Sequence, residues 1–357
     1  MAALAKLRAV VGERLLGSPW LRRLDRISFL GTLDFHPASR RSSSRLAHSL
    51  GVAELGLRVA GELGLDPALT RTFVAACLLH DIGHFPLSHA AEPGFERALG
   101  VDHHAVSEWI VRGNGAIDRG RSMRPDLEAA GIDPEVTWSL ITGDAEDLAL
   151  RPLAALLRAP INLDTLDGIL RAAHAFRIRG LRLPERLFRG GRGAVRIDAD
   201  ALPLFDRFWA LKDRVYGDVI ALPSNVLCEA GLSAAVEGRF TPAVFAAFER
   251  FDDDSIAGLV RDQVAQSGLD RGVDDRFRFL PFARDGALLR RARKRYHVDR
   301  SVLPGPDGLA LEIWPQRYRH ERQVLTLVST EPEAQLVLPG FEGSMARELT
   351  LAEGPEI

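Results

Sequence analysis

The first third of the chain holds a dense group of histidines, some of them beside carboxylates. Six of the ten histidines lie within 57 residues, at His48, His80, His84, His89, His103 and His104. Asp81 directly follows His80 at the end of an apolar run, where a buried carboxylate is costly unless a cation neutralises it. His48 and Asp164 stand in two other apolar helical segments. Together these two imidazoles and two carboxylates suit a divalent first-row metal that keeps open positions for water and substrate.

Helices are predicted to position these side chains. The spacing of apolar residues predicts a buried helix over residues 44–64. Asp66 and Pro67 are typical of a helix start, and they open the apolar helix that leads to His80. We expect His84, one helical turn further on, to face the same side as His80. Further helical stretches are predicted after Asp102, after Asp133 and over residues 148–175, the last divided by prolines.

The second half of the chain has a more mixed pattern. Residues 176–200 are rich in Arg and Gly and predict a loop that can hold short strands, whereas residues 201–267 return to helical spacing. Residues 309–314 and 323–329 read as strands, and the tail after Glu342 is expected to fray. We therefore predict a mainly α protein: a helical core, a helical extension and a small mixed α/β C-terminal segment.

Four sequence blocks occur in the order and spacing of a known enzyme family. They are RLAHSLG (45–51), LHDIGHFPLSH (79–89), HHAVS (103–107) and the late Asp164. These blocks resemble the HD-domain metal-dependent phosphohydrolases, most closely the deoxynucleoside-triphosphate triphosphohydrolase branch. The resemblance is strong over about residues 20–175. It implies an N-terminal helical segment at 1–18, an HD-domain catalytic core at 19–178 and the helical extension with its mixed α/β segment at 179–357.

The resemblance also implies roles for residues around the metal. His89 is the expected general acid that protonates the leaving oxygen, and Glu92 is expected to keep it protonated and oriented. His84 and His103 are expected to contact phosphoryl oxygens. A metal held by His48, His80, Asp81 and Asp164 would lower the pKa of bound water and neutralise charge on the phosphoryl group. The donor set accepts Mn, Fe, Ni, Co, Zn or Mg.

Several positions of the expected substrate pocket depart from the family pattern. Thr165 stands where the family has Lys, Gly168 where it has Tyr, Ala172 where it has Asp, Phe29 where it has Gln, Phe208 where it has Arg, and His104 where it has Glu. Because Thr165 and Phe208 remove two cations, we expect weak discrimination between mono-, di- and triphosphates. The retained substrate-binding candidates are Arg45, Arg171, Arg214 and Tyr216. Arg171 also has a structural alternative, an i,i+4 ion pair with Asp167.

These residues predict an enzyme that uses a metal-activated water to cleave a phosphoester of a nucleotide or a related small molecule. One alternative is a dNTP triphosphohydrolase that releases inorganic triphosphate. Another is a nucleotide-binding regulatory module with little turnover. A further alternative is a di-iron oxidase, since His84, His103 and His104 are available for a second metal.

Composition narrows the class of protein. The chain has 357 residues, a formal net charge of −2 and 46% hydrophobic residues, which excludes wholesale disorder and a strongly cationic nucleic-acid binder. No stretch approaches the roughly 20 uncharged apolar residues of a membrane span, so none is expected. Charged residues interrupt every apolar run among the first 17 residues, so a signal peptide is not expected either. With only two cysteines, Cys77 and Cys228, a disulfide framework is not expected either. We expect a cytoplasmic protein that binds neither membrane nor nucleic acid, and a homo-oligomer like the relatives it resembles.

Overall fold

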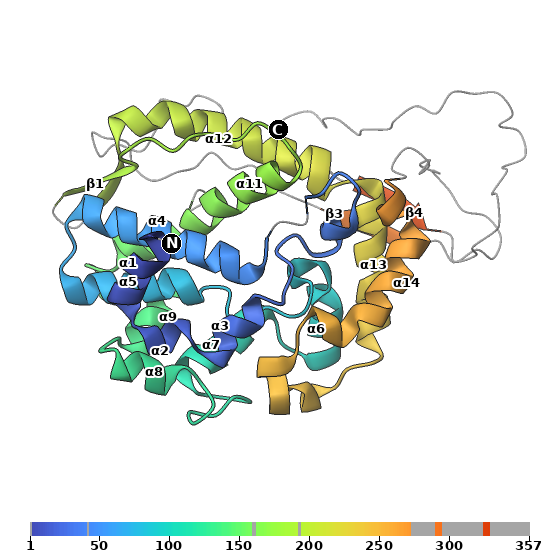
Figure 1. The fold of residues 1–357 in the computed structure, drawn as a ribbon, viewed down its shortest axis with the longest axis horizontal. Coiled ribbons are helices and arrows are strands. Elements are labelled where there is room, and N and C mark those ends of the chain that lie inside the picture. Colours follow the sequence, from blue (N-terminus) through green and yellow to red (C-terminus); the bar gives the residue numbers. More distant parts are fainter. Residues whose placement is uncertain are drawn as a thin grey trace, which may run out of the picture.

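Helices make up most of the protein in this computed structural model (Figure 1). The structure describes residues 2–40, 43–158, 162–191, 194–272, 290–294 and 324–328. Within these ranges the strands are limited to two short antiparallel pairs. The mainly α fold expected from the sequence is therefore confirmed.

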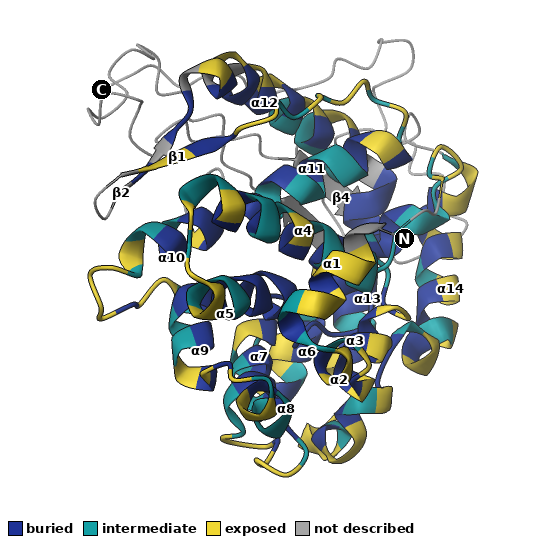
Figure 2. Cartoon of the chain, turned by 60° about the vertical axis from the view of Figure 1, so that its left-hand side comes forward, coloured by how far each residue is buried: buried dark blue, intermediate teal, exposed yellow. Residues whose placement is uncertain are grey.

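The first half of the chain forms helices that pack around two central ones, α4 (Arg45–Leu63) and α5 (Pro67–Leu79). The others are α1 (Ala2–Val11), α2 (Glu13–Leu16), α3 (Pro19–Leu24), α6 (Glu92–Leu99), α7 (His103–Arg112), α8 (Arg124–Ala129), α9 (Pro134–Thr142), α10 (Arg151–Arg158) and α11 (Leu163–Ala175). The second half of helix α5 is enclosed: residues 72–79 are all buried, and Figure 2 shows α5 among the other helices. Helix α4 packs against α5 on one side and α11 on the other (Figure 1). A Cβ added at Gly56 of α4 would lie 2.6 Å from Sγ of Cys77, so this glycine permits the close approach of α4 and α5.

Capping residues begin the helices that carry the site. The side chains of Asp66, Asp102 and Asp133 each accept backbone N–H groups of the first turn of α5, α7 and α9, as predicted. Asn162 does the same for α11, accepting from Thr165 N. Ser44 caps α4 in the same manner. The caps at Asp66, Asp102 and Asp133 were predicted from the sequence, whereas those at Ser44 and Asn162 were not.

The end of α5 differs from the sequence expectation. The helix ends at Leu79, with His80 as its C-cap, and residues 81–83 form a turn. His80 and His84 are therefore not on one helical face, and the expected i,i+4 relationship is wrong. A Cβ added at Gly83 would lie 2.3 Å from Ser107 N and 2.4 Å from His103 O of α7. The turn that follows α5 therefore packs closely against the backbone of α7.

The second half adds helices around the first. The elements are β1 (Phe188–Gly191), β2 (Ala194–Ile197), α12 (Leu202–Val215), the π-helical turn η4 (Tyr216–Ile220), α13 (Pro223–Glu237), the 3-10 segments η5 (Pro242–Arg250) and η6 (Asp253–Ile256), α14 (Ala257–Ser267), β3 (Arg290–Lys294) and β4 (Val324–Val328). Helix α12 packs on α11 and α13 packs on α6. Strand β1 pairs with β2, with Phe188 opposite Ile197, which confirms strands within 176–200.

The predicted strand at 323–329 is confirmed as β4, which pairs with β3. The predicted strand at 309–314 and the tail after Glu342 lie outside the described residues. Among the helices that the structure describes, no single one is long and apolar enough to cross a membrane. Only the bent pair of Pro203–Ile220 with Ser224–Glu237 meets that test, by length and composition.

Candidate metal centre

The four predicted metal ligands come together from three segments of the chain. His48 lies on α4, His80 and Asp81 follow α5, and Asp164 lies in the first turn of α11. One donor atom from each of the four lies within 4.8 Å of the others. Oδ1 of Asp164 is 3.0 Å from Nε2 of His48 and 3.7 Å from Nε2 of His80. Oδ2 of Asp81 is 3.4 Å from Nε2 of His80.

Both imidazoles leave the same ring nitrogen for a ligand. Nδ1 of His48 lies 2.7 Å from Oδ2 of Asp167, and Nδ1 of His80 lies 2.9 Å from the carbonyl oxygen of Cys77. Each Nε2 is buried and has no hydrogen-bond partner. A histidine that binds a metal characteristically donates from its other nitrogen to a carboxylate or carbonyl, which fixes the tautomer and the ring. Two orphaned Nε2 atoms facing two carboxylates therefore fit a divalent metal.

Asp167 and Arg171 support His48 from α11. Nε and Nη2 of Arg171 donate to the two carboxylate oxygens of Asp167 at 2.8 and 2.9 Å, and Nη2 also donates to Ala47 O. A Cβ added at Gly51 would lie 2.1 Å from Oδ1 of Asp167, so this glycine of α4 leaves room for the Asp167–Arg171 ion pair. Sequence reasoning noted the i,i+4 pair but missed its contact with His48. The signal was the position of Asp167, one helical turn after Asp164.

The charges at this centre are strongly coupled. Burial alone would raise the pKa of the Asp81 carboxyl, but His80, His84 and Arg45 hold it well below its usual range. Nη1 of Arg45 donates to Oδ2 of Asp81 at 2.6 Å, and both side chains are buried. Burial disfavours the His80 imidazolium, but Asp81 and Asp164 raise its pKa well above the usual value. A metal bound at this centre would compete with a proton for Nε2 of His80.

A second group of titratable residues adjoins the first. Glu92 bridges two imidazoles: its Oε2 lies 2.8 Å from Nδ1 of His89, and its Oε1 bonds Nδ1 of His103. These two histidines hold the pKa of Glu92 low although burial opposes this. His84 stacks on His103 with ring centroids 4.1 Å apart, and neither of its ring nitrogens has a hydrogen-bond partner. Donor atoms of His84, His89, Glu92 and His103 also lie within 4.8 Å of one another.

Backbone strain marks the turn just before His89. Leu87 and Ser88 have φ values of 56° and 54°, in the left-handed region. The Ser88 hydroxyl donates to Ser28 O at 2.6 Å and accepts from Nε of Arg45 at 2.7 Å. Asp253, from a distant part of the chain, also stabilises this turn. Its carboxylate accepts hydrogen bonds from Leu87 N at 2.7 Å and from Ser28 N at 2.8 Å. Such strain persists only where the surroundings enforce it.

Asp253 and Arg23 are two site-supporting residues that sequence reasoning missed. Arg23 is fully buried, and its guanidinium donates to Phe251 O at 2.7 Å and to His84 O. Burial lowers its pKa to about 9. No local motif connects residues 23 and 253 with the histidines, since the contacts span more than 60 positions of sequence. Only the tertiary structure brings them there.

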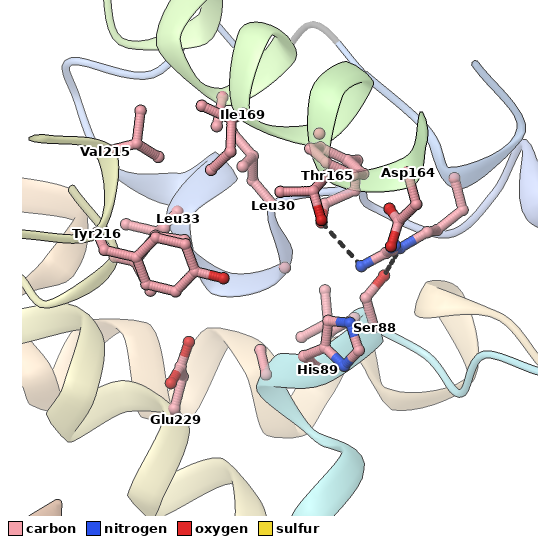
Figure 3. Close-up of a pocket in the computed structure, with 18 residues that line it drawn as sticks. Leu30, Leu33, Ser88, His89, Asp164, Thr165, Ile169, Val215, Tyr216 and Glu229 are labelled. Atoms are coloured by element: carbon pink, nitrogen blue, oxygen red, sulfur yellow. Dashed lines mark hydrogen bonds between the residues drawn. The ribbon is translucent and has the colours of Figure 1, made fainter. Parts of the chain in front are cut away.

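Two cavities adjoin the candidate metal centre and share Arg45, His89 and Asp164 in their linings. The first, of about 190 Å³, is lined by Phe29, Leu30, Gly31, Leu33, Arg45, Leu87, Ser88, His89, Ala90, Asp164, Thr165, Gly168, Ile169, Ala172, Val215, Tyr216, Ile220 and Glu229. Figure 3 shows Asp164, Ser88 and His89 at one end of it, and Tyr216 and Glu229 at the other. The second, of about 210 Å³, is lined by Arg45, His80, Asp81, His89, His103, His104, Ile141, Leu157, Arg158, Asn162 and Asp164.

The predicted substrate-binding residues are placed differently from one another. Arg45 lines both cavities, and Tyr216 lines the first. Arg171 lines neither, because its guanidinium is held by Asp167. Arg214 also lines neither: it is exposed, and Nε lies 3.7 Å from Asp218. The geometry favours the structural alternative for Arg171, and substrate roles for both stay predictions.

Five of the six positions that depart from the family pattern line one of the two cavities. Phe29, Thr165, Gly168 and Ala172 all line the first. His104 lines the second. Phe208 is buried in the core and lines neither cavity. Four of the six departures thus change the lining of the first cavity.

A helical core with this His-Asp metal arrangement defines a known class of domain. Residues 45–123 match the family model of the HD domain. The chain therefore carries an HD domain, which includes His48, His80 and Asp81, while Asp164 follows it. The recognition made from the sequence motifs is confirmed.

The chain resembles several curated proteins over part of their length. It is 31% identical over 168 residues to the uncharacterized protein YwfO of Bacillus subtilis, covering 45% of this chain and 35% of that protein. It is 31% identical over 173 residues to an uncharacterized Mycoplasma genitalium protein, covering 45% and 38%. A deoxyguanosinetriphosphate triphosphohydrolase-like protein of Rhodopseudomonas palustris is 44% identical over 116 residues, covering 31% and 26%. The chain thus spans less than two fifths of the length of these relatives.

Solved structures share the fold more completely. A hypothetical protein from Aquifex aeolicus has a TM-score of 0.67 at 19% identity, covering 89% of this chain and 92% of that one. A phosphohydrolase from Bacteroides thetaiotaomicron has a TM-score of 0.66 at 17% identity, covering 89% and 94%. At these identities the likeness establishes the helical fold.

Proposed function

We propose that the protein is a metal-dependent phosphohydrolase that cleaves a phosphoester of a nucleotide or a related small molecule. One observation carries the proposal. The unpartnered Nε2 atoms of His48 and His80 face Asp81 and Asp164, and a carboxylate-held imidazole, His89, borders the same space. A metal site beside a positioned acid is the arrangement that phosphoester hydrolysis requires.

The metal and the protein groups would divide the chemistry. When bound, a divalent ion would act as a Lewis acid: it would lower the pKa of water, so that hydroxide is available near neutral pH, and neutralise charge on the phosphoryl group. His48, His80, Asp81 and Asp164 hold that ion. Arg45 neutralises Asp81 and, through Ser88, fixes the turn that precedes the acid.

His89 is the proposed general acid. Its side chain is 60% exposed and lines both cavities, so it reaches substrate. Because Nδ1 is bound to Glu92, the second ring nitrogen, Nε2, carries the proton for the leaving oxygen. His103 shares Glu92, and its own Nε2 is left for a phosphoryl oxygen. Glu92 thus orients an acid and a phosphoryl ligand together.

A dNTP triphosphohydrolase is the second candidate function. It is favoured by the names of relatives such as the triphosphohydrolase-like protein of Rhodopseudomonas palustris. Against it stand Thr165 and Gly168, which line the first cavity where the family has Lys and Tyr. A nucleotide-binding module with little turnover is a third reading, and the His89–Glu92 pair argues against it, because binding alone needs no acid.

Phosphate release from a panel of nucleoside mono-, di- and triphosphates, with and without Mn²⁺, tests the proposal. We expect metal-dependent release of inorganic phosphate or polyphosphate, abolished in Asp81→Ala. The matched control is Asp118→Ala, which removes an exposed carboxylate that lines neither cavity. Inorganic triphosphate as the sole product would establish the second candidate. Stoichiometric nucleotide binding without release would establish the binding module.

A further inference from the structure

The first cavity has two chemically different ends. Ser88, His89 and Asp164 lie at the end beside the candidate metal centre (Figure 3). Tyr216 and Glu229 lie at the opposite end (Figure 3). Aliphatic and aromatic side chains form most of the lining between them. A ligand with its phosphoryl group at the metal centre therefore extends along an apolar wall towards Glu229.

Glu229 brings a carboxylate to the far end of this cavity. It lies on α13, and Figure 3 shows its carboxylate directed towards Tyr216. The other charged side chains among the described lining residues, Arg45, His89 and Asp164, border the metal centre. A carboxylate so placed repels an anionic group and accepts hydrogen bonds. The far end of the cavity therefore suits a group that donates hydrogen bonds, and it disfavours a phosphate.

A buried asparagine holds Glu229 in place. Asn225 is completely buried, and its Nδ2 donates to Oε1 of Glu229 at 3.0 Å and to Ile220 O at 3.0 Å. Its Oδ1 accepts the hydroxyl of Thr32 at 2.7 Å. Ile220 belongs to the lining, and Thr32 stands between two residues of the lining. One carboxylate oxygen of Glu229 is thus fixed, and a carboxylate has further lone pairs with which to accept from a ligand.

Two aromatic rings line the same cavity. Tyr216 begins the π-helical turn η4, a type of turn that is frequent at functional sites. The ring of Phe29 lies 4.7 Å from that of His48, and a Cβ added at Gly168 would be 3.4 Å from Cζ of Phe29. Apolar walls with aromatic rings and a few fixed polar groups are typical of sites that bind a planar organic ring.

The polar groups that the resembled family has in this cavity are largely absent here. Phe29, Thr165, Gly168 and Ala172 stand where the family has Gln, Lys, Tyr and Asp. Each replacement removes an amide, a charge or a phenol from the lining. Selection of the organic part therefore depends on the polar groups at the far end, where Glu229 carries the charge.

We propose that Glu229 determines the specificity of the first cavity by accepting a hydrogen bond from the exocyclic amino group of a nucleobase. This inference rests on the proposed function and specifies its substrate class: nucleotides whose base carries an amino group. The phosphoryl group then lies at the metal centre, and the base lies along the apolar wall with its amino group at Glu229. A base with a carbonyl oxygen in that place would set an acceptor against the carboxylate, so it is rejected.

Binding of nucleosides tests this assignment without turnover. Calorimetry compares adenosine with purine riboside, guanosine with inosine, and cytidine with pyrimidin-2-one riboside, because the members of each pair differ only by an amino group. We expect the parent protein to bind the amino member of at least one pair about tenfold or more tightly, as for other hydrogen bonds to charged groups. Glu229→Gln keeps the shape of the side chain but removes its charge, and it should bring that ratio close to one.

Glu237→Gln is the matched control. Glu237 is the last residue of the same helix, pairs with Arg97 and lines neither cavity, so its variant should keep the parent ratio. A second readout is kcat/KM with Mn²⁺ for the nucleotides of the same pairs, each with the same number of phosphates. We expect the same preference in the parent protein and the same loss in Glu229→Gln.

Equal affinity of the parent protein for both members of every pair would overturn the inference, as would a ratio that Glu229→Gln leaves unchanged. The 2′-deoxy counterparts distinguish the base from the sugar. An effect of Glu229→Gln that depends on the 2′-hydroxyl and not on the amino group would assign Glu229 to the sugar and overturn the inference as well. Absence of phosphate release from any nucleotide would instead defeat the proposed function, and nucleoside binding would still decide what Glu229 recognises.

Discussion

Oδ2 of Asp167 lies 2.7 Å from Nδ1 of His48 and fixes the ring so that Nε2 faces the metal site. Asp167→Asn should lower metal affinity about 10- to 100-fold while the four ligands remain, because the ring loses its orienting carboxylate. Competition with a chelator, read by elemental analysis, measures this. Glu54→Gln, an exposed carboxylate on the same helix as His48, is the control and should bind metal like the parent. Equal affinities in all three proteins would show that Asp167 does not support the site.

Asp81→Ala should abolish stoichiometric metal binding and also destabilise the metal-free protein. From the sequence, Asp81 looks like an unpaired carboxylate whose removal relieves the fold. In the structure it pairs with the buried Arg45 at 2.6 Å, so alanine leaves a buried guanidinium without its partner. Breaking a buried pair in this way costs about 3 to 5 kcal/mol. Urea unfolding in the presence of a chelator measures the loss, and an unchanged midpoint would contradict the pairing.

His89→Ala should lose about 10² to 10⁴ in kcat and keep its metal content and substrate affinity, since an acid acts only in the transition state. Glu92→Gln should give an intermediate loss, because it leaves the imidazole in place but removes the charge that orients it. Single-turnover rates and equilibrium binding separate the two effects. Parent-like turnover in His89→Ala would remove it from the acid role.

Asp253 should make stability depend on pH in a recognisable window. Burial raises the pKa of its carboxyl to about 6, although Leu87 N and Ser28 N donate to it. The folded state then binds the proton more tightly than the unfolded chain, where the pKa is about 3.9. The Asp253 carboxyl therefore adds most to the free energy of unfolding below about pH 4, and this contribution is lost as pH rises through 6. The change amounts to about 1 to 3 kcal/mol.

Asp253→Asn removes this titration, so the stability difference between parent and variant should shift in favour of the parent as pH falls from 7 to 5. Urea unfolding at a series of pH values measures it. The control is Asp254→Asn, the exposed neighbour, whose difference from the parent should stay constant over the same range. A constant difference for Asp253→Asn as well would show that its carboxyl does not titrate in this window.

The sequence by itself identified the proposed metal ligands and most of the helices of the first half. His80 and Asp81 are adjacent, and caps such as Asp66 and Asp102 act within three residues, so local pattern is enough to identify them. The motif order then indicated which remote residues, His48 and Asp164, complete the set. These features depend on short-range chemistry that the sequence displays directly.

Tertiary structure alone decided how the site is supported and what borders it. Asp253 holds the turn before His89 from 166 positions away, and Arg23 bonds the carbonyl of His84 from 61 positions away. The end of α5 at Leu79, after which Gly83 packs closely on α7, means that His80 and His84 do not share a helical face. Such contacts leave no periodic trace, because the free energy of a buried hydrogen bond depends on which groups meet and not on their separation in sequence.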